Sequence, residues 1–362
     1  MSLSTSPAAA PPAAVPPAAL SLAASFAGRF QLGTCVGGVL PGSLQPAERA
    51  LLTRHFNVLT PENCMKPGPI HPEPERFDFA AGDALVSFAA EHRVAVIGHT
   101  LCWHQQSPAW MFEAGIGREA ALAQLRAHIH GVADHYAGRV CGWDVVNEAV
   151  ADAGELLRDT PAARAIGPDY VQRAFELARE ADPSAELYYN DYNIEQPAKR
   201  ERTLRLMKQL LASGVRVDGV GIQGHWLLDQ VPFDDIRAAI REFRELGLKV
   251  MITELDLDVV DRPDCSADIA VQRAYAPRDD VYRDGLPEAV ALHQAEQYAR
   301  LFRLFGELPG AVTRVSFWGL HDGRSWLNTW PGKRTNHPLL FDRACRPKPA
   351  FQAVLAAAEA TP

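Results

Sequence analysis

Residues 140–149 read VCGWDVVNEA, a short apolar run that ends at the carboxyl group of Glu148. A second run of this kind, LKVMITELDLD at residues 248–258, carries Glu254 near its end. Short apolar runs bounded by turn residues are typical of buried β-strands. Burying a carboxylate is costly unless a partner or a polar cleft receives it. Two such glutamates in one chain therefore indicate residues that carry chemistry.

Runs like these alternate with helical segments from residue 29 onward. The predicted strands are residues 29–38, 56–63, 94–101, 140–148, 185–193, 219–226, 249–256 and 314–320. Between them, apolar residues recur at three- and four-residue steps, as at Leu122, Leu125, Ile129 and Val132, which is the period of an amphipathic helix. Strands that are apolar on both faces fit a doubly wound sheet or a closed barrel, and eight repeats favour closure. We predict an α/β fold, a single (β/α)8 TIM barrel.

Polar or aromatic side chains gather where seven of these strands end. They are Glu62 and Asn63, His99 and Trp103, Asn147 and Glu148, Asn190 and Asp191, Gln223 and His225, Glu254 and Asp256, and Trp318 and Asp322. The C-terminal ends of barrel strands form the mouth in which active sites are built. We therefore expect the active site at this end of the barrel.

The composition argues against two classes of protein. The chain has 362 residues, a net charge of −8 and a pI near 5.8, whereas a nucleic-acid binder carries a basic face. No stretch of about 18 apolar residues follows the N-terminal segment, so we expect no membrane-spanning helix. Nothing in the sequence indicates an oligomer. We expect a monomer that binds neither nucleic acid nor membrane.

Residues 1–28 differ in composition from the rest of the chain. They are rich in Ala, Pro and Ser and contain no Lys or Arg, so they bury too little apolar surface to fold. We interpret them as a disordered tail or a processed leader, and residues 29–362 as the catalytic barrel. Small residues suit a signal-peptide cleavage site, but a positive n-region is missing and prolines interrupt the run. The localisation stays open between the cytoplasm and a slightly favoured secreted or periplasmic location.

Two facing carboxyl groups suit the hydrolysis of a glycosidic bond. One acid protonates the leaving oxygen, and a second carboxylate attacks or activates water. Glu148 and Glu254 lie on the fourth and seventh predicted strands, on opposite sides of a closed barrel. A separation of about 5 to 5.5 Å gives retention of anomeric configuration, and about 6.5 to 9.5 Å gives inversion. The sequence leaves this choice open.

The neighbours of the two glutamates predict their roles. Asp256 lies on the same strand face as Glu254, and His225 at the adjacent strand end can donate a hydrogen bond that keeps a carboxylate ionised. Glu254 is then the nucleophile, and Glu148, protonated beside it, is the acid/base. Asn147 can reach a sugar 2-hydroxyl.

Aromatic side chains complete the predicted site. Trp103, Trp318, Trp326, Trp330 and Tyr192 fall at strand ends or in the loops beyond them. Flat apolar rings pack against the C–H faces of sugars. This pattern predicts an extended saccharide cleft.

Two other functions compete with this interpretation. A metallohydrolase could use His99, His104, His225 and His321 as zinc ligands, but the first strand has no His-x-His and the chain has no HExxH motif. We expect neither a metal nor a cofactor. A barrel that only binds polysaccharide would have lost one carboxylate, and both are present here.

Seven sequence blocks occur in an order that resembles a known family. They are FNVLTPENCMK, GHTLCWH, WDVVNEA, LYYNDYN, GVGIQGHW, ITELD and WGLHDGRSW. Between about Phe30 and Phe351, the chain resembles family 10 glycoside hydrolases, the endo-1,4-β-xylanases. The resemblance implies cleavage of internal bonds of xylan or xylo-oligosaccharides by a retaining double displacement through a covalent glycosyl-enzyme.

The resemblance also implies roles for individual residues. Glu254 is the nucleophile and Glu148 the acid/base, with Asp256 in support. On the glycone side it places Glu62, Asn63, Lys66, His99, Trp103, Trp318 and Trp326. Around the scissile sugar it places Asn147, Gln223 and His225, and toward the leaving group Tyr192 and Gln106. A bulky tryptophan at Trp326 implies a preference for xylose over glucose. Beyond the last strand, Trp330, Lys333 and Arg334 could add a platform or a charged contact for decorated chains.

Overall fold

The computed structural model describes residues 21–262, 266–272 and 280–360. The strands of this part of the chain are β1 (Gln31–Val36), β2 (Val58–Pro61), β3 (Ala95–Trp103), β4 (Gly142–Asn147), β5 (Glu186–Asp191), β6 (Gly219–Ile222), β7 (His225–Leu227), β8 (Lys249–Asp258) and β9 (Val312–Phe317). Each lies within or overlaps one of the eight predicted strand segments. The sixth segment, residues 219–226, is the one that divides, into β6 and β7.

The strands close into a parallel barrel. The sheet order is β6-β5-β4-β3-β2-β1-β9-β8-β7, and a pairing between β6 and β8 joins its ends. The predicted (β/α)8 barrel is therefore confirmed. β7 lies outside the barrel closure and pairs with the C-terminal half of β8, with His225 opposite Asp256. This short strand brings a histidine from one segment beside a carboxylate from the next.

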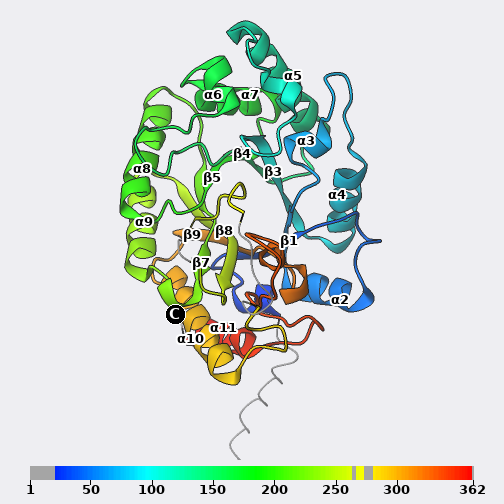
Figure 1. Cartoon of the computed structure of the whole chain (residues 1–362), viewed down its shortest axis with the longest axis vertical. Coiled ribbons are helices and arrows are strands. Elements are labelled where there is room, and N and C mark those ends of the chain that lie inside the picture. The colour runs from blue at the N-terminus through cyan, green and yellow to red at the C-terminus, as the bar shows by residue number, and fades with distance from the viewer. Residues whose placement is uncertain (1–20, 263–265, 273–279, 361–362) are drawn as a thin grey trace, which may run out of the picture.

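Helices surround the barrel, as Figure 1 shows. They are α1 (Leu22–Ser25), α2 (Pro46–His55), α3 (Pro67–Ile70), α4 (Ala80–His92), α5 (Arg118–Tyr136), α6 (Pro161–Ile166), α7 (Tyr170–Ala181), α8 (Pro197–Ala212), α9 (Phe233–Glu245), α10 (Glu288–Gly306) and α11 (Pro349–Ala360). The predicted amphipathic pattern is confirmed in α5, where Leu125, Ile129 and Val132 are fully buried. None of the helices described is long and apolar enough to cross a membrane.

The folded chain begins earlier than the expected boundary at residue 28. Residues 22–25 form α1, and both Leu22 and Phe26 are buried. The Phe26 ring lies 4.8 Å from that of Phe30 and 5.1 Å from that of Phe302. Burial of these apolar side chains stabilises a segment that its Ala- and Ser-rich composition had assigned to a tail. Residues 1–20 lie outside the described residues.

The layer between the barrel and α5, where Trp143 of β4 packs against Tyr136, leaves no room for a side chain at Gly98 on β3. A Cβ atom there would lie 2.1 Å from the ring of Trp143, which is completely buried on β4. We expect Gly98→Ala to lower the free energy of unfolding by about 1–3 kcal/mol, because overpacking forces neighbouring atoms to shift. Chemical denaturation measures this change. The matched control is Gly42→Ala, where the nearest atom is 3.8 Å away; equal stabilities of the two variants would contradict the prediction.

Candidate active site

Nearly all of the predicted site residues meet at the C-terminal ends of the strands. They line one cavity of about 150 Å³: Glu62, Asn63, Lys66, His99, Trp103, Gln106, Asn147, Glu148, Gln223, His225, Glu254, Trp318 and Trp326. Asp256 lies behind His225 and does not line this cavity. The two glutamates that the sequence singled out therefore face the same space.

Glu254 is held by donors from two other strands, β5 and β7. Its Oε1 accepts a hydrogen bond from Asn190 Nδ2 at 2.7 Å, and its Oε2 lies 3.3 Å from His225 Nε2. His225 Nδ1 in turn lies 3.0 Å from Asp256 Oδ1. Both carboxylates and the imidazole are nearly or fully buried. The three residues form a charged triad at the end of β8.

The surroundings of Glu254 keep its carboxyl group ionised. Burial raises the pKa of Glu254, but the hydrogen bond from His225, the charges of His99 and His225 and the hydrogen bond from Asn190 outweigh it, so the pKa lies below its ordinary value. Burial lowers the pKa of His225, yet Asp256 and Glu254 together raise it to about 10. His225 is therefore a cation at neutral pH that donates from both ring nitrogens.

Glu148 occupies a strained position directly after β4. Its φ is +58°, in the left-handed region that non-glycine residues rarely adopt, and its backbone N–H donates to Asn190 O at 2.8 Å. This turn directs the carboxyl group into the cavity. There its Oε2 accepts from Trp103 Nε1 at 2.9 Å, and its Oε1 accepts from Gln223 Nε2 at 3.0 Å.

The environment of Glu148 favours the protonated acid. Burial raises its pKa above the ordinary value, and hydrogen bonds from Gln223 and Trp103 oppose this only in part. The negative charge of Glu254 raises the pKa of Glu148 further. The pKa values of the two carboxyl groups are thus shifted in opposite directions within one cavity.

Side-chain amides connect the two glutamates. Asn190 Nδ2 donates to Asn147 Oδ1 at 2.9 Å as well as to Glu254. Asn147 Nδ2 donates to Glu148 Oε1 at 3.2 Å. These bonds fix the carboxyl groups relative to one another, because each amide side chain is buried and held at both ends.

The cavity is also lined by a buried cation. Lys66 Nζ donates to Asn63 Oδ1 at 2.9 Å and lies 4.8 Å from the centre of the Trp103 ring. Burial lowers the pKa of Lys66, and the charges of Glu254 and Glu62 oppose this shift. An ammonium group beside an aromatic ring can donate to sugar hydroxyls.

The histidines considered as zinc ligands do not converge. Three of them contact carboxylates instead: His99 with Asp144, His225 with Asp256 and Glu254, and His321 with Glu48. In the described ranges, no three His, Cys, Asp or Glu side chains are grouped so that they could hold a metal ion.

Comparison with known proteins agrees with this geometry. A family model described as Glycosyl hydrolase family 10 matches residues 21–357. The chain belongs to glycosyl hydrolase family 10. An endo-1,4-beta-xylanase of Geobacillus stearothermophilus is 41% identical over 92% of this chain and 98% of that protein. Endo-1,4-beta-xylanase A of Xylanibacter ruminicola is 39% identical over 90% of each protein.

Solved structures of the family share the whole barrel. A GH10 endoxylanase retrieved from a sugarcane soil metagenome is 38% identical, with a TM-score of 0.89 over 93% of this chain and 99% of that chain. A mutant structure in complex with xylotriose is 37% identical, with a TM-score of 0.83 over the same shares. The resemblance read from the seven motif blocks is therefore confirmed, and it places the chain in a family of retaining glycoside hydrolases.

One predicted contact of this family 10 chain lies outside the catalytic cavity. Tyr192 is only 1% exposed, and its hydroxyl donates to Asp152 Oδ2 at 2.8 Å and accepts from Arg158 Nη2 at 2.6 Å. Lys199 Nζ covers the ring at 3.7 Å from its centre. Tyr192 lines a neighbouring cavity of about 570 Å³ that Ser266 also lines. Its contact with a leaving-group sugar stays a prediction, for that neighbouring cavity.

In the loop beyond β9, Trp330 and Arg334 make contacts within the protein. Trp330 is 6% exposed and stacks on Trp326 with ring centres 4.4 Å apart. Arg334 is buried and donates from Nη2 to Asp258 Oδ2 at 2.6 Å. Neither residue is among those that line the catalytic cavity, and their contact with decorated chains stays a prediction. Lys333 is exposed.

The structure adds residues that the sequence did not assign. Ala267 and Ile269, in the loop after β8, line the catalytic cavity. Asp268 between them lies 3.8 Å from Arg158 and within 3.5 Å of Gln105. Nothing in the pattern of this loop marks it as part of the site. The sequence analysis noted Asn190 at the end of a strand but assigned it no role.

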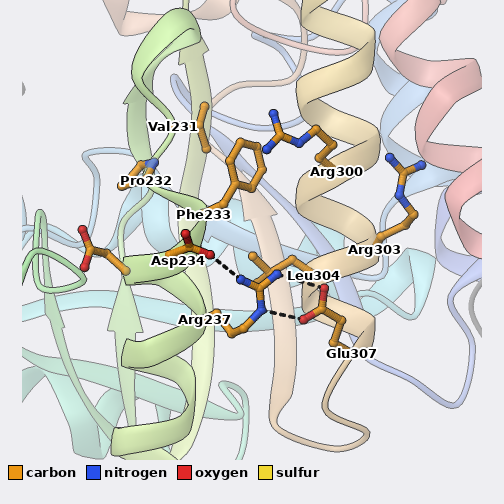
Figure 2. Close-up of a pocket in the computed structure, with 10 residues that line it drawn as sticks. Val231, Pro232, Phe233, Asp234, Arg237, Arg300, Arg303, Leu304 and Glu307 are labelled. Atoms are coloured by element: carbon orange, nitrogen blue, oxygen red, sulfur yellow. Dashed lines mark hydrogen bonds and ion pairs between the residues drawn. The ribbon is translucent and has the colours of Figure 1, made fainter.

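A larger cavity lies on the outer wall of the barrel, between α9 and α10 (Figure 2). Its volume is about 600 Å³, and none of the predicted site residues lines it. Arg237 there donates to Asp234 Oδ1 at 2.8 Å and to Glu307 Oε2 at 2.7 Å. Arg300 lies 3.8 Å from the centre of the Phe233 ring. The charges on this wall are largely paired with one another, and the chemistry belongs to the smaller cavity.

Proposed function

We propose that this chain is an endo-1,4-β-xylanase that cleaves internal bonds of xylan and xylo-oligosaccharides with retention of configuration. Glu254 is the nucleophile and Glu148 the acid/base. The observation that carries this proposal is that Glu148 and Glu254 face one cavity with their pKa values shifted in opposite directions, because double displacement needs one carboxylate and one carboxylic acid in the same cavity. Family membership supports the reaction class, and the named relatives support the substrate.

In the first step, a carboxylate oxygen of Glu254 bonds to the anomeric carbon. The glycosidic C–O bond breaks with its electrons on the leaving oxygen, and Glu148 gives that oxygen its proton. His225 and Asn190 hold the Glu254 carboxylate ionised and oriented until it attacks. The result is a covalent glycosyl-enzyme and a shortened chain that leaves.

In the second step, water replaces the departed chain. Glu148, now ionised, removes a proton from this water, the water oxygen bonds to the anomeric carbon, and Glu254 leaves as a carboxylate. The raised pKa of Glu148 suits its roles as acid and then as base, because this pKa is closer to neutral pH than that of an ordinary carboxyl group. Two inversions at one carbon give net retention.

The cavity walls supply the contacts for the sugar. Glu62, Asn63, Lys66 and His99 offer hydrogen bonds, and Trp103, Trp318 and Trp326 offer aromatic surface on the glycone side. Asn147, which is hydrogen-bonded to Glu148 and Asn190, is the residue that we expect to bond to the 2-hydroxyl, a contact that strengthens in the transition state. Trp326 lines the same cavity, and the family resemblance implies that a bulky side chain here favours xylose over glucose by crowding a hydroxymethyl group.

We further propose that a single catalytic domain acts as a monomer. The described elements form one barrel. Size-exclusion chromatography with light scattering tests this directly.

The proposed function is tested by NMR of the anomeric protons released from xylohexaose in the first minutes. We expect early β-anomer, which then mutarotates. Early α-anomer would contradict retention, and intact hexaose would contradict xylan as the substrate and require a screen of other glycans.

A further inference from the structure

Trp326 is joined to the nucleophile by an unbroken chain of hydrogen bonds. Its indole Nε1–H donates to Asp256 Oδ2 at 2.8 Å. Asp256 Oδ1 accepts from His225 Nδ1 at 3.0 Å, and His225 Nε2 donates to Glu254 Oε2 at 3.3 Å. We propose that Trp326 is a positioning residue that keeps Glu254 ionised through Asp256 and His225. This inference rests on the proposed role of Glu254 as the nucleophile.

The indole N–H stabilises the negative charge of Asp256. That carboxylate is fully buried, and a buried carboxylate depends on the donors that reach its oxygens. His225 serves Oδ1, and within the described part of the chain Trp326 is the side chain that serves Oδ2. Without this donor, the anionic form of the triad is less stabilised. The triad then takes up its next proton at a higher pH.

Trp326 also lies where substrate is expected to bind. Its side chain lines the catalytic cavity, and its ring centre lies 4.8 Å from that of His225. A sugar packed on this ring would therefore touch a residue that also stabilises the triad. One side chain thus connects the glycone pocket to the charge of the nucleophile.

The position of the Trp326 ring is fixed from behind. Trp330 stacks on it at 4.4 Å, and Arg262 lies 4.9 Å from the centre of the Trp330 ring. Arg262 and Arg334 both donate to Asp258 Oδ2, two residues beyond Asp256 on β8. The loop after β9 is thereby fastened to the strand that carries the nucleophile, which keeps the indole N–H aimed at Asp256.

Other charged or titratable groups act on the triad from the surrounding elements. They are Cys35 on β1, Lys66 after β2, His99 on β3, Glu148 after β4 and Tyr298 on α10. Glu62 faces Lys66 and Cys35. Substitution of Trp326 leaves all of them in place, so a change in proton uptake reports the loss of the indole donor.

The test compares Trp326→Phe with Trp330→Phe. The two tryptophans stack on each other, but Trp330 Nε1 has no hydrogen-bond partner among the described residues, so only the first substitution removes a bond to the triad. The probe is a 2-deoxy-2-fluoro-β-xylobioside with a dinitrophenolate leaving group. A Glu254 oxygen bonds to the anomeric carbon, and dinitrophenolate departs with its electron pair. This step needs no proton donor, so its pH dependence reports the nucleophile.

We expect the acid limb of the inactivation rate to move upward by about one pH unit in Trp326→Phe, since a lost hydrogen bond to a charged group has this size. It should not move in Trp330→Phe. An unchanged acid limb in Trp326→Phe, or an equal rise in both variants, would overturn the inference while wild-type inactivation still supports Glu254 as the nucleophile. A wild-type enzyme that is not inactivated at any pH would overturn the proposed function itself.

A second measurement uses wild-type protein, so it does not depend on whether a Trp326 variant folds. In wild-type protein labelled with ¹⁵N at the tryptophan indoles, we expect the Trp326 signal to titrate with the same midpoint as the acid limb of inactivation. The Trp330 signal should stay constant through that range. A Trp326 signal that does not titrate would contradict the connection between the indole and the triad.

Discussion

Replacement of Glu254 by alanine is expected to lower kcat on xylan by at least about 10⁴-fold, because the variant has no oxygen that can bond to the anomeric carbon. The affinity for xylo-oligosaccharides should change little. Binding is spread over aromatic and polar walls that the substitution leaves in place, among them Trp103, Trp318 and Lys66. Reducing-sugar release measures the first effect, and calorimetric titration with xylohexaose measures the second.

A small nucleophile should restore part of the lost reaction. Azide fits the space that the Glu254 side chain vacates, where Asn190 and His225 still offer their N–H groups to an anion. With an aryl xylobioside as substrate, we expect an α-glycosyl azide, because a single displacement inverts the configuration. The β-azide would contradict the assignment of Glu254.

The control for this experiment is Glu113→Ala, an exposed glutamate outside the cavity, prepared in the same way. It should hydrolyse xylan at the wild-type rate. Hydrolysis by Glu254→Ala above the level of an inactive preparation, with the same product anomer as wild type, would show that another group is the nucleophile.

The sequence identified both glutamates because each breaks a local rule. A carboxylate at the end of an apolar strand is unfavourable unless the fold provides for it, and such inconsistencies mark functional positions. The supporting role of Asp256 followed from strand geometry, since it lies two residues after Glu254 on the same face. The barrel was predicted because short apolar strand segments alternate along the chain with segments of helical periodicity. All of these features can be read from residues that are close together in the sequence.

The residues that the sequence missed depend on tertiary placement. Ala267 and Ile269 are small or apolar residues in a loop without periodicity, so nothing local distinguishes them from loop residues that face away from the site. Trp330 is the converse case: a tryptophan in a loop can face sugar or stack behind another ring, and only packing decides. In residues 21–28, Leu22 and Phe26 lie four apart as on one helix face, but the surrounding Ala-rich composition obscured that signal.

Replacement of Glu148 by alanine is expected to affect substrates according to their leaving groups. On xylan, kcat/KM should fall by about 10³-fold, within the range that general acid catalysis contributes. On a dinitrophenyl xylobioside, the first step should proceed at nearly the wild-type rate, because dinitrophenolate leaves without a proton. The second step should be slow, since no base activates water. Rapid mixing should therefore show a burst of dinitrophenolate equal to the enzyme concentration, and equal losses on the two substrates would contradict the acid/base role.

The pH dependence provides an independent check on Glu148. As the acid in the first step, it must be protonated, so wild-type activity on xylan is present below its raised pKa and is lost as the pH rises through that value. Glu254 must be ionised, so activity is lost as the pH falls through its lowered pKa. The wild-type profile is bell-shaped, and Glu148→Ala should lose only the basic limb. If the variant keeps the basic limb, that limb belongs to another group. Lys66 would be the first residue to test, because burial lowers its pKa.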